Sequence, residues 1–105
     1  MKYPPTKVIA IDVDDTLCIR GRCNAKLVAW CRAMSAKGYS LMLWSARGKD
    51  HATSVATTLC VADVFDVITG KPGYIVDDKG WTWTKFTRVL PLSAIANAEL
   101  EQHES

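Results

Sequence analysis

The sequence predicts an α/β fold built on a parallel sheet, and two observations support this. Apolar runs of strand length recur along the chain, and between the first three of them apolar residues repeat at helical spacing. Alternating strand and helix patterns are typical of parallel sheets joined by crossover helices. With 105 residues the chain has the length of one domain with a single core. We therefore expect a single α/β domain over residues 1–105.

The first predicted elements are a strand and a helix. The apolar run Val8–Ile11 predicts a buried strand, and a loop over Leu17–Cys23 follows it. Asn24 predicts the start of a helix that runs to about Lys37, because its side chain can accept a hydrogen bond from a first-turn amide. Gly38 predicts the end of this helix, because glycine readily adopts the left-handed backbone conformation. The helix is expected to bury Leu27, Trp30, Cys31 and Met34.

Three further strands and a second helix are predicted next. The apolar runs Tyr39–Trp44, Val64–Ile68 and Tyr74–Val76 have the length of strands. The second helix is expected to begin near Asp50, which is a candidate for its N-cap. Its apolar stripe consists of Ala52, Val55, Ala56, Leu59 and Cys60.

The chain after Gly80 is predicted from composition alone. Trp81–Phe86 is rich in strand formers, which indicates an edge strand or a ribbon. Pro91–Glu104 is expected to hold a short helix, because proline suits a first helical turn. Trp81 and Trp83 alternate along their segment, so they could stack on bases, form an oligomer contact or cover the sheet edge. Of these three interpretations we favour packing of the two tryptophans against the sheet edge.

Composition and charge place the chain among ordinary soluble proteins. Hydrophobic residues make up 49% of the chain and charged residues 23%. The formal net charge of +2 does not favour polyanion binding by bulk charge. No apolar stretch is long enough to span a bilayer, and Asp12 interrupts the first apolar run before it could form a signal peptide. We therefore expect a cytoplasmic protein with no membrane partner.

The four cysteines form no metal-binding pattern. Their spacing contains no Cys-x-x-Cys pair. Cys31 and Cys60 fall on apolar helix stripes and are expected in the core. Cys18 and Cys23 flank the loop after the first strand, but a reducing compartment disfavours a disulfide between them. We expect four reduced thiols with structural roles.

Polar residues follow the predicted strands and suggest a site. Because ligands bind at the carboxyl ends of strands in open α/β sheets, these residues are expected to lie together. An aspartate there can attack phosphorus, and a second carboxylate can carry the proton. Adjacent carboxylates repel each other unless a cation lies near, which indicates a metal. In chain order the residues are Asp12, Asp14, Ser45, Lys71, Asp77 and Asp78.

This order resembles the haloacid dehalogenase (HAD) superfamily. Its motifs are Asp-x-Asp-x-Thr after a hydrophobic strand, then a Ser or Thr, a Lys and an acidic pair, and the likeness covers roughly residues 7–80. It implies a minimal Rossmann-like, HAD-type parallel sheet with helices on both faces. The short gap at Leu17–Cys23 implies that there is no cap domain. The family often has glycine where this chain has Asp15.

The resemblance also implies an activity, that of a phosphomonoester hydrolase acting through an aspartyl-phosphate. Asp12 would be the nucleophile, and Asp14 would first protonate the leaving oxygen and then deprotonate the attacking water. Ser45 would donate its hydroxyl to a phosphate oxygen. Lys71 would neutralise the developing charge.

Magnesium is the cofactor that the resemblance implies. Its ligands would be the Asp12 carboxylate, the main-chain carbonyl of Asp14, and one or both of Asp77 and Asp78. A hard cation with few carboxylate ligands and several waters fits this set. Which residue of the acidic pair binds directly is left open, with Asp78 slightly favoured.

Substrate choice depends on arginines near the motifs. The stretch Ser45–Gly48, Ser-Ala-Arg-Gly, resembles the Ser-Gly-Arg of the phosphatase domain in phage polynucleotide kinases. Arg22 and Arg47 could hold a substrate phosphate, or both could be solvated surface residues. His51 lies just past this loop and could reach substrate, but on a first helical turn we expect it to be simply exposed.

The leading expectation is a nucleic-acid end phosphate or a nucleotide as substrate. The alternatives are a small sugar phosphate, with the open site closed by a partner in a homo-oligomer, and a non-catalytic phosphate-binding or regulatory domain. The complete motif set argues against the last, because a binding domain would not need both a nucleophile and an acid/base.

Overall fold

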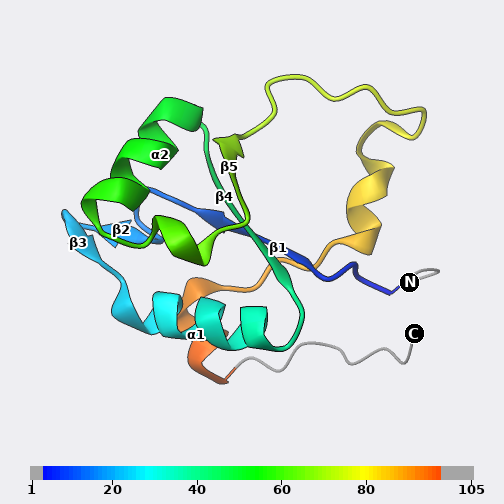
Figure 1. Ribbon diagram of the computed structural model, residues 1–105. Helices are drawn as coiled ribbons and strands as arrows, with labels where there is room; N and C mark the ends of the chain where they lie inside the picture. The colour runs from blue at the N-terminus through cyan, green and yellow to red at the C-terminus, as the bar shows by residue number, and fades with distance from the viewer. Residues whose placement is uncertain (1–3, 98–105) are drawn as a thin grey trace.

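A three-stranded parallel sheet forms the centre of the molecule (Figure 1). This computed structural model describes residues 4–97. Asp12 lies opposite Trp44, and Ser45 lies opposite Gly70, so the carboxyl ends of all three strands meet at one edge. The expected α/β fold with a parallel sheet is confirmed. In spatial order the strands are β1 (Val8–Asp12), β4 (Ser40–Ser45) and β5 (Val67–Gly70).

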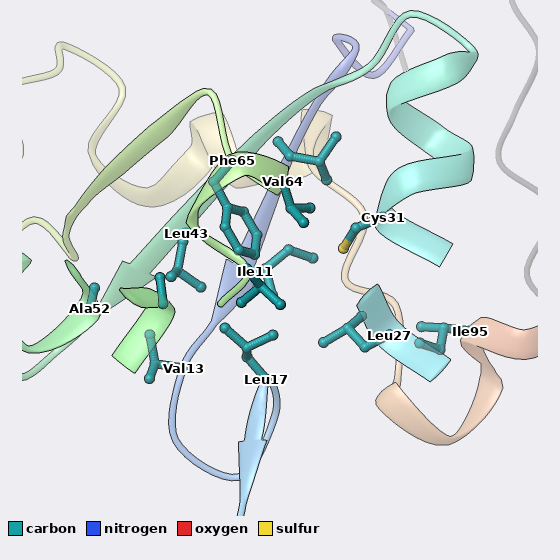
Figure 2. Close-up of a cluster of buried hydrophobic side chains, with 13 residues drawn as sticks. Ile11, Val13, Leu17, Leu27, Cys31, Leu43, Ala52, Val64, Phe65 and Ile95 are labelled. Atoms are coloured by element: carbon teal, nitrogen blue, oxygen red, sulfur yellow. The ribbon is translucent and has the colours of Figure 1, made fainter. Parts of the chain in front are cut away.

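Two α-helices cross between the strands and pack with them in one core. α1 (Ala25–Ala36) connects β1 with β4, and α2 (Lys49–Thr58) connects β4 with β5. Figure 2 shows side chains of both helices gathered around Ile11 and Leu43 of the sheet. Leu41, Leu43, Cys31, Ala52 and Ala56, among others, are completely buried in this core.

Both α-helices cover the same face of the sheet, which corrects the expectation of helices on both faces. Ile11 and Leu43, paired in register, belong to the covered face. Val8 and Val67 occupy positions of the opposite face, and they are 51% and 48% exposed. The strand order gives the reason: β4 and β5 are added successively on one side of β1. Right-handed crossovers that advance in one direction place their helices on one face.

The ends of α1 are formed as the sequence predicts. The Asn24 side chain accepts a hydrogen bond from the Leu27 amide at 3.2 Å. At the other end Gly38 has φ 93°, a conformation that favours glycine. The Gly38 amide donates to Ser35 and the Tyr39 amide to Met34, which together form a Schellman motif.

The start of α2 differs from the expectation. Its N-cap is Gly48, with φ 101°, and no side chain caps the helix. Asp50 lies in the first turn instead of at the cap. Its negative charge is favourable there because the N-terminus of a helix carries partial positive charge.

The third strand begins later than its apolar run suggests. Val64 ends a short 3₁₀ turn, η1 (Ala62–Val64), and both Val64 and Phe65 are buried in the core rather than paired in the sheet. Asp66 starts the pairing with β4, because its amide donates to Leu41 and its carboxylate accepts from the Leu41 amide. The strand therefore runs from Val67 to Gly70.

The loop after β1 contains a small antiparallel hairpin. Its strands are β2 (Cys18–Ile19) and β3 (Arg22–Cys23), joined by Arg20 and Gly21 (Figure 1). This hairpin occupies the connection between the end of β1 and the start of α1.

No strand forms over Tyr74–Val76, contrary to the prediction. Tyr74 is 96% exposed and Val76 is fully exposed. Parallel strands need a crossover of about a dozen or more residues. Only the residues 71–73 separate β5 from Tyr74, so this run has no route to the sheet as a fourth parallel strand.

The segment after Gly80 is helical, which corrects the expected edge strand or ribbon. The 3₁₀ helix η2 (Gly80–Phe86) is stabilised by threonine hydroxyls, because Thr82 and Thr84 donate to the carbonyls three residues before them, each at 2.7 Å. Trp81 and Trp83 stack with their ring centroids 6.4 Å apart. Trp81 is nevertheless exposed, so it does not cover the sheet.

The last described element confirms part of the expected C-terminal helix. η3 (Leu92–Asn97) follows Pro91, and its Ile95 side chain is buried in the core. The remainder of that predicted helix, to Glu104, lies outside the described residues. Within residues 4–97 no helix has the length and apolar character needed to cross a bilayer.

Candidate active site

Asp12 and Lys71 meet at the carboxyl edge of the sheet. Asp12 is the last residue of β1, and Lys71 directly follows β5. The Lys71 Nζ lies 3.3 Å from Asp12 Oδ1, and the Thr16 hydroxyl lies 3.5 Å from the other carboxylate oxygen. Lys71 also lies over the Trp44 ring, 5.9 Å from its centroid. Both charged side chains remain open to solvent, so a ligand can reach the carboxylate.

Asp14 is held by two basic side chains from the start of α2. Its Oδ1 lies 3.4 Å from the Arg47 guanidinium and 3.2 Å from His51 Nε2. The His51 side chain is only 21% exposed, so the expectation of a simply exposed histidine is wrong. Arg47 precedes the N-cap Gly48, and His51 lies in the first turn of α2. The position of His51 just after a strand-end loop is the sequence signal that it could reach the site.

Ser45 ends β4, the central strand of the sheet, and is buried. Its hydroxyl accepts a hydrogen bond from the Arg47 amide at 3.0 Å, and its carbonyl accepts from the amides of Gly48 and Lys71. These bonds tie the start of α2 and the end of β5 to one residue. The hydroxyl hydrogen can still be donated, because a serine oxygen accepts and donates at once.

The backbone at the start of α2 approaches β5 closely. A Cβ atom at Gly70 would lie 3.2 Å from the Gly48 Cα, a tight contact that favours glycine at position 70. The uncapped amides at the α2 N-terminus therefore lie beside the end of β5. Such amides, with the helix dipole, favour anions.

We call the cluster at this edge the polar edge. It brings together five of the residues proposed from sequence and adds His51. Its carboxylates and the side chains of Arg47 and Lys71 are open to solvent, and none of the carboxylates lines the hollow formed by Pro72, Gly73, Ile75, Asp77, Gly80 and Trp81. The polar edge consists of Asp12, Asp14, Ser45, Arg47, His51 and Lys71.

Asp77 and Asp78 lie apart from the polar edge, on the exposed loop after Lys71. The Asp77 carboxylate accepts a hydrogen bond from the Lys79 amide at 2.7 Å, and Asp78 lies 3.9 Å from the Lys79 ammonium. Both contacts are local. Within the described part of the chain, no group of three or more acidic, histidine or cysteine side chains is arranged to hold a metal ion.

Arg22 lies on β3 of the hairpin, and its side chain is exposed. Its main chain pairs with Ile19 across the hairpin. Among residues 4–97 it has no ion pair with a carboxylate of the polar edge, in contrast to Arg47.

Two ionisable groups outside the polar edge have shifted pKa values. Burial raises the pKa of the Cys31 thiol to about 11, because the thiolate would lose its hydration in the core. The hydrogen bond from Arg32, at 3.0 Å, lowers the pKa of Asp63 at the exposed surface. Neither group contacts the carboxylates of the site.

Comparison of the chain with models of known protein families, with characterised proteins and with solved structures finds no match.

Proposed function

We propose that this protein is a magnesium-dependent phosphomonoester hydrolase that acts through an aspartyl-phosphate formed on Asp12. The observation that carries the proposal is the ion pair between Asp12 and Lys71 at the carboxyl edge of a parallel sheet, at 3.3 Å. It combines an accessible carboxylate with a cation where ligands of open α/β sheets bind. The resemblance of the motif order to HAD phosphatases supports the same chemistry.

In the first step a carboxylate oxygen of Asp12 attacks the phosphorus of the ester. The bond from phosphorus to the ester oxygen breaks, and the leaving oxygen takes a proton from the Asp14 carboxyl group. The products are an alcohol and an acyl phosphate on Asp12.

In the second step water replaces Asp12 on phosphorus. Asp14 removes a proton from the attacking water, the acyl-phosphate bond breaks, and inorganic phosphate leaves with the Asp12 carboxylate restored. The contact of Asp14 with His51 would hold the orientation of the carboxyl group through both steps. We assign His51 a positioning role on this ground.

Positive groups near Asp12 would stabilise the phosphoryl oxygens. Lys71 already lies beside the nucleophile, and the uncapped N-terminus of α2 presents amides on the same edge. The Ser45 hydroxyl would donate to one phosphate oxygen. These donors match the requirement of phosphoryl transfer for charge neutralisation around an in-line nucleophile.

Magnesium fits part of this donor set. It is usually bound through one or two carboxylates together with water and substrate phosphate, and the Asp12 carboxylate with the Asp14 carbonyl provides oxygen donors of this kind. A bound cation would supply further positive charge to the phosphate. Asp77 and Asp78 could join only after the loop from Lys71 folds back over the edge. Five residues, 72–76, lie between Lys71 and Asp77, and the six residue steps from one to the other span at most about 20–22 Å.

For the substrate we propose a nucleic-acid end phosphate or a nucleotide. The polar edge is open, which leaves room for an extended ester, and the Arg47 guanidinium is largely exposed beside Asp14. A small sugar phosphate would need a further wall, supplied by a second copy of the chain.

The proposal is tested with p-nitrophenyl phosphate as substrate, with and without Mg²⁺. We expect turnover that requires Mg²⁺, is lost in EDTA and falls by several orders of magnitude in Asp12→Asn, because the amide cannot attack phosphorus. Asp15→Asn is the matched control. Asp15 is exposed, its φ of 60° suits asparagine equally well, and it should keep its activity.

Three results would contradict parts of this proposal. Activity in Asp12→Asn above a few per cent would exclude the covalent route, and full activity in metal-free protein would exclude the magnesium requirement. If the folded wild type shows no turnover on p-nitrophenyl phosphate, nucleotides, end-phosphorylated oligonucleotides and sugar phosphates, the chain is a phosphate-binding domain instead.

A further inference from the structure

Cys18 and Cys23 lie directly opposite each other in the hairpin that follows Asp14. β2 and β3 run antiparallel side by side, with Cys18 paired to Cys23 (Figure 1). The joining residues Arg20 and Gly21 have φ values of 53° and 76°, which a tight two-residue hairpin turn requires. Both thiols are free and half-buried.

The hydrogen bonds identify the type of this cross-strand pair. The Asn24 amide donates to the Leu17 carbonyl at 2.8 Å, which makes Leu17 and Asn24 a hydrogen-bonded pair. Directly opposite pairs alternate along an antiparallel ladder, so Cys18 and Cys23 form a non-hydrogen-bonded pair. The Cys18 amide and carbonyl confirm this, since both point away from β3 and bond to Val13 and Asp15.

This pair type suits a disulfide. In non-hydrogen-bonded pairs the two Cα atoms generally lie about 4.5 Å apart, within the range of about 4.4–6.8 Å that disulfides span. The bond therefore needs no change in backbone register. The other two thiols have no such partner: Cys31 is buried in the core, and Cys60 follows α2 at the opposite end of the sheet.

We propose that Cys18 and Cys23 form a reversible disulfide, a redox modification site for small-molecule disulfides such as oxidised glutathione. This inference does not depend on the hydrolase activity. Formation of the disulfide can affect the position of Asp14, because the Cys18 main chain bonds to Val13 and Asp15, the residues on both sides of Asp14.

The reaction is thiol–disulfide exchange in two steps. One protein thiolate attacks a sulfur of oxidised glutathione, forming a mixed disulfide and releasing one glutathione thiolate. The second protein thiolate attacks the protein sulfur of that mixed disulfide and releases a second glutathione thiolate. The dithiol loses two electrons and two protons, and one glutathione disulfide is reduced to two thiols.

The experiment uses the full chain with Cys60→Ser, which removes the lone exposed thiol. The protein is equilibrated with glutathione buffers of increasing oxidised fraction, quenched with acid and mapped by mass spectrometry. We expect a species two hydrogen atoms lighter, with Cys18 linked to Cys23, that reduced glutathione converts back. Loss of free thiol should be complete for these two residues and absent for Cys31.

Single variants in the same background provide the control. Cys18→Ser and Cys23→Ser should each stop at a mixed disulfide carrying one glutathionyl group, because no second thiol can displace it. The proposal is overturned if the Cys60→Ser protein carries two glutathionyl groups, remains fully reduced in oxidised glutathione, or links either residue to Cys31. The first measurement needs neither single variant to fold.

Discussion

Two apolar runs in this chain each end in a pair of aspartates, and they have opposite fates. Val8–Asp12 becomes β1. The carboxylates of Asp12 and Asp14 at its end contact basic residues from the loop before α2, from the first turn of α2 and from the end of β5. Tyr74–Val76 forms no strand, and within residues 4–97 the carboxylates of Asp77 and Asp78 have their hydrogen bond and ion pair with the neighbouring Lys79.

The difference shows that a carboxylate pair becomes part of a site through the partners that the sheet supplies. β1 has β4 beside it and a helix-covered face beneath it, so the side chain of Ile11 is buried and Asp12 is fixed at an edge. The second run follows β5 after only three residues, too short for a parallel crossover. Its apolar side chains remain in solvent.

The largest effect is expected for the acid/base of the first pair. Asp14→Asn should lower kcat for p-nitrophenyl phosphate by about 10²–10⁴-fold, because a general acid/base contributes about that factor. Asp78→Asn is the comparison, and in saturating Mg²⁺ it should keep kcat but raise the Mg²⁺ concentration needed for half-maximal activity. If Asp78→Asn lowers kcat as much as Asp14→Asn, the two pairs act as one site and the contrast between them fails.

The next effect concerns the free energy of unfolding, compared between the sheet core around β1 and the exposed run Tyr74–Val76. Leu43, which pairs with Ile11, is completely buried, and Leu43→Ala should lower the free energy of unfolding by about 2–5 kcal/mol. Val76→Ala should change it by less than about 0.5 kcal/mol, since Val76 is fully exposed. Urea denaturation followed by circular dichroism measures both. An equal loss would mean that the second run packs in solution.

Alkaline pH should lower the free energy of unfolding through Cys31, which lies in the same core as Ile11 (Figure 2). The folded pKa of about 11 lies above the ordinary 9.0, so the folded state keeps the proton that the unfolded state releases. The stabilisation is fully present below pH 9 and is lost as pH rises towards 11. By linkage the loss is about 3 kcal/mol.

The measurement is the free energy of unfolding of wild type and Cys31→Ala between pH 8 and 11. Other titrating groups affect both proteins, so the difference between their curves isolates the thiol. Parallel curves would show that Cys31 is hydrated in the folded state.

The smallest effect is expected for two arginines, Arg47 and Arg22, that could bind further phosphates of a long substrate. Arg47→Ala and Arg22→Ala should each lower kcat/KM for an end-phosphorylated oligonucleotide about tenfold, while p-nitrophenyl phosphate changes less than about twofold. Only the long ester carries extra phosphates, so the log–log salt slope should also flatten by about 0.7 for each lost contact. Lys79→Ala, which removes the partner of Asp78, is the control and should change neither.

Equal losses on both substrates would instead assign the arginines to the reacting phosphate or to the fold. If neither substitution changes kcat/KM for the oligonucleotide, a small phosphate ester replaces the nucleic-acid end as the proposed substrate.

The sequence by itself determined the elements whose signals are local. Asn24 caps α1 through its own side chain, Gly38 ends the helix because it tolerates a left-handed backbone, and the spacing of Leu27 and Cys31 defines the buried face. The motif order also placed Asp12, Ser45 and Lys71 at strand ends, because parallel strands share one edge.

Only the tertiary structure decided the remaining features, because they depend on partners distant in the chain. The strand order placed both α-helices on one face, and the short connection after β5 kept Tyr74–Val76 out of the sheet. The pairing of His51 with Asp14 arises where the start of α2 meets the end of β1. Local propensity describes what a segment can form, whereas its neighbours in space determine whether that form is stable.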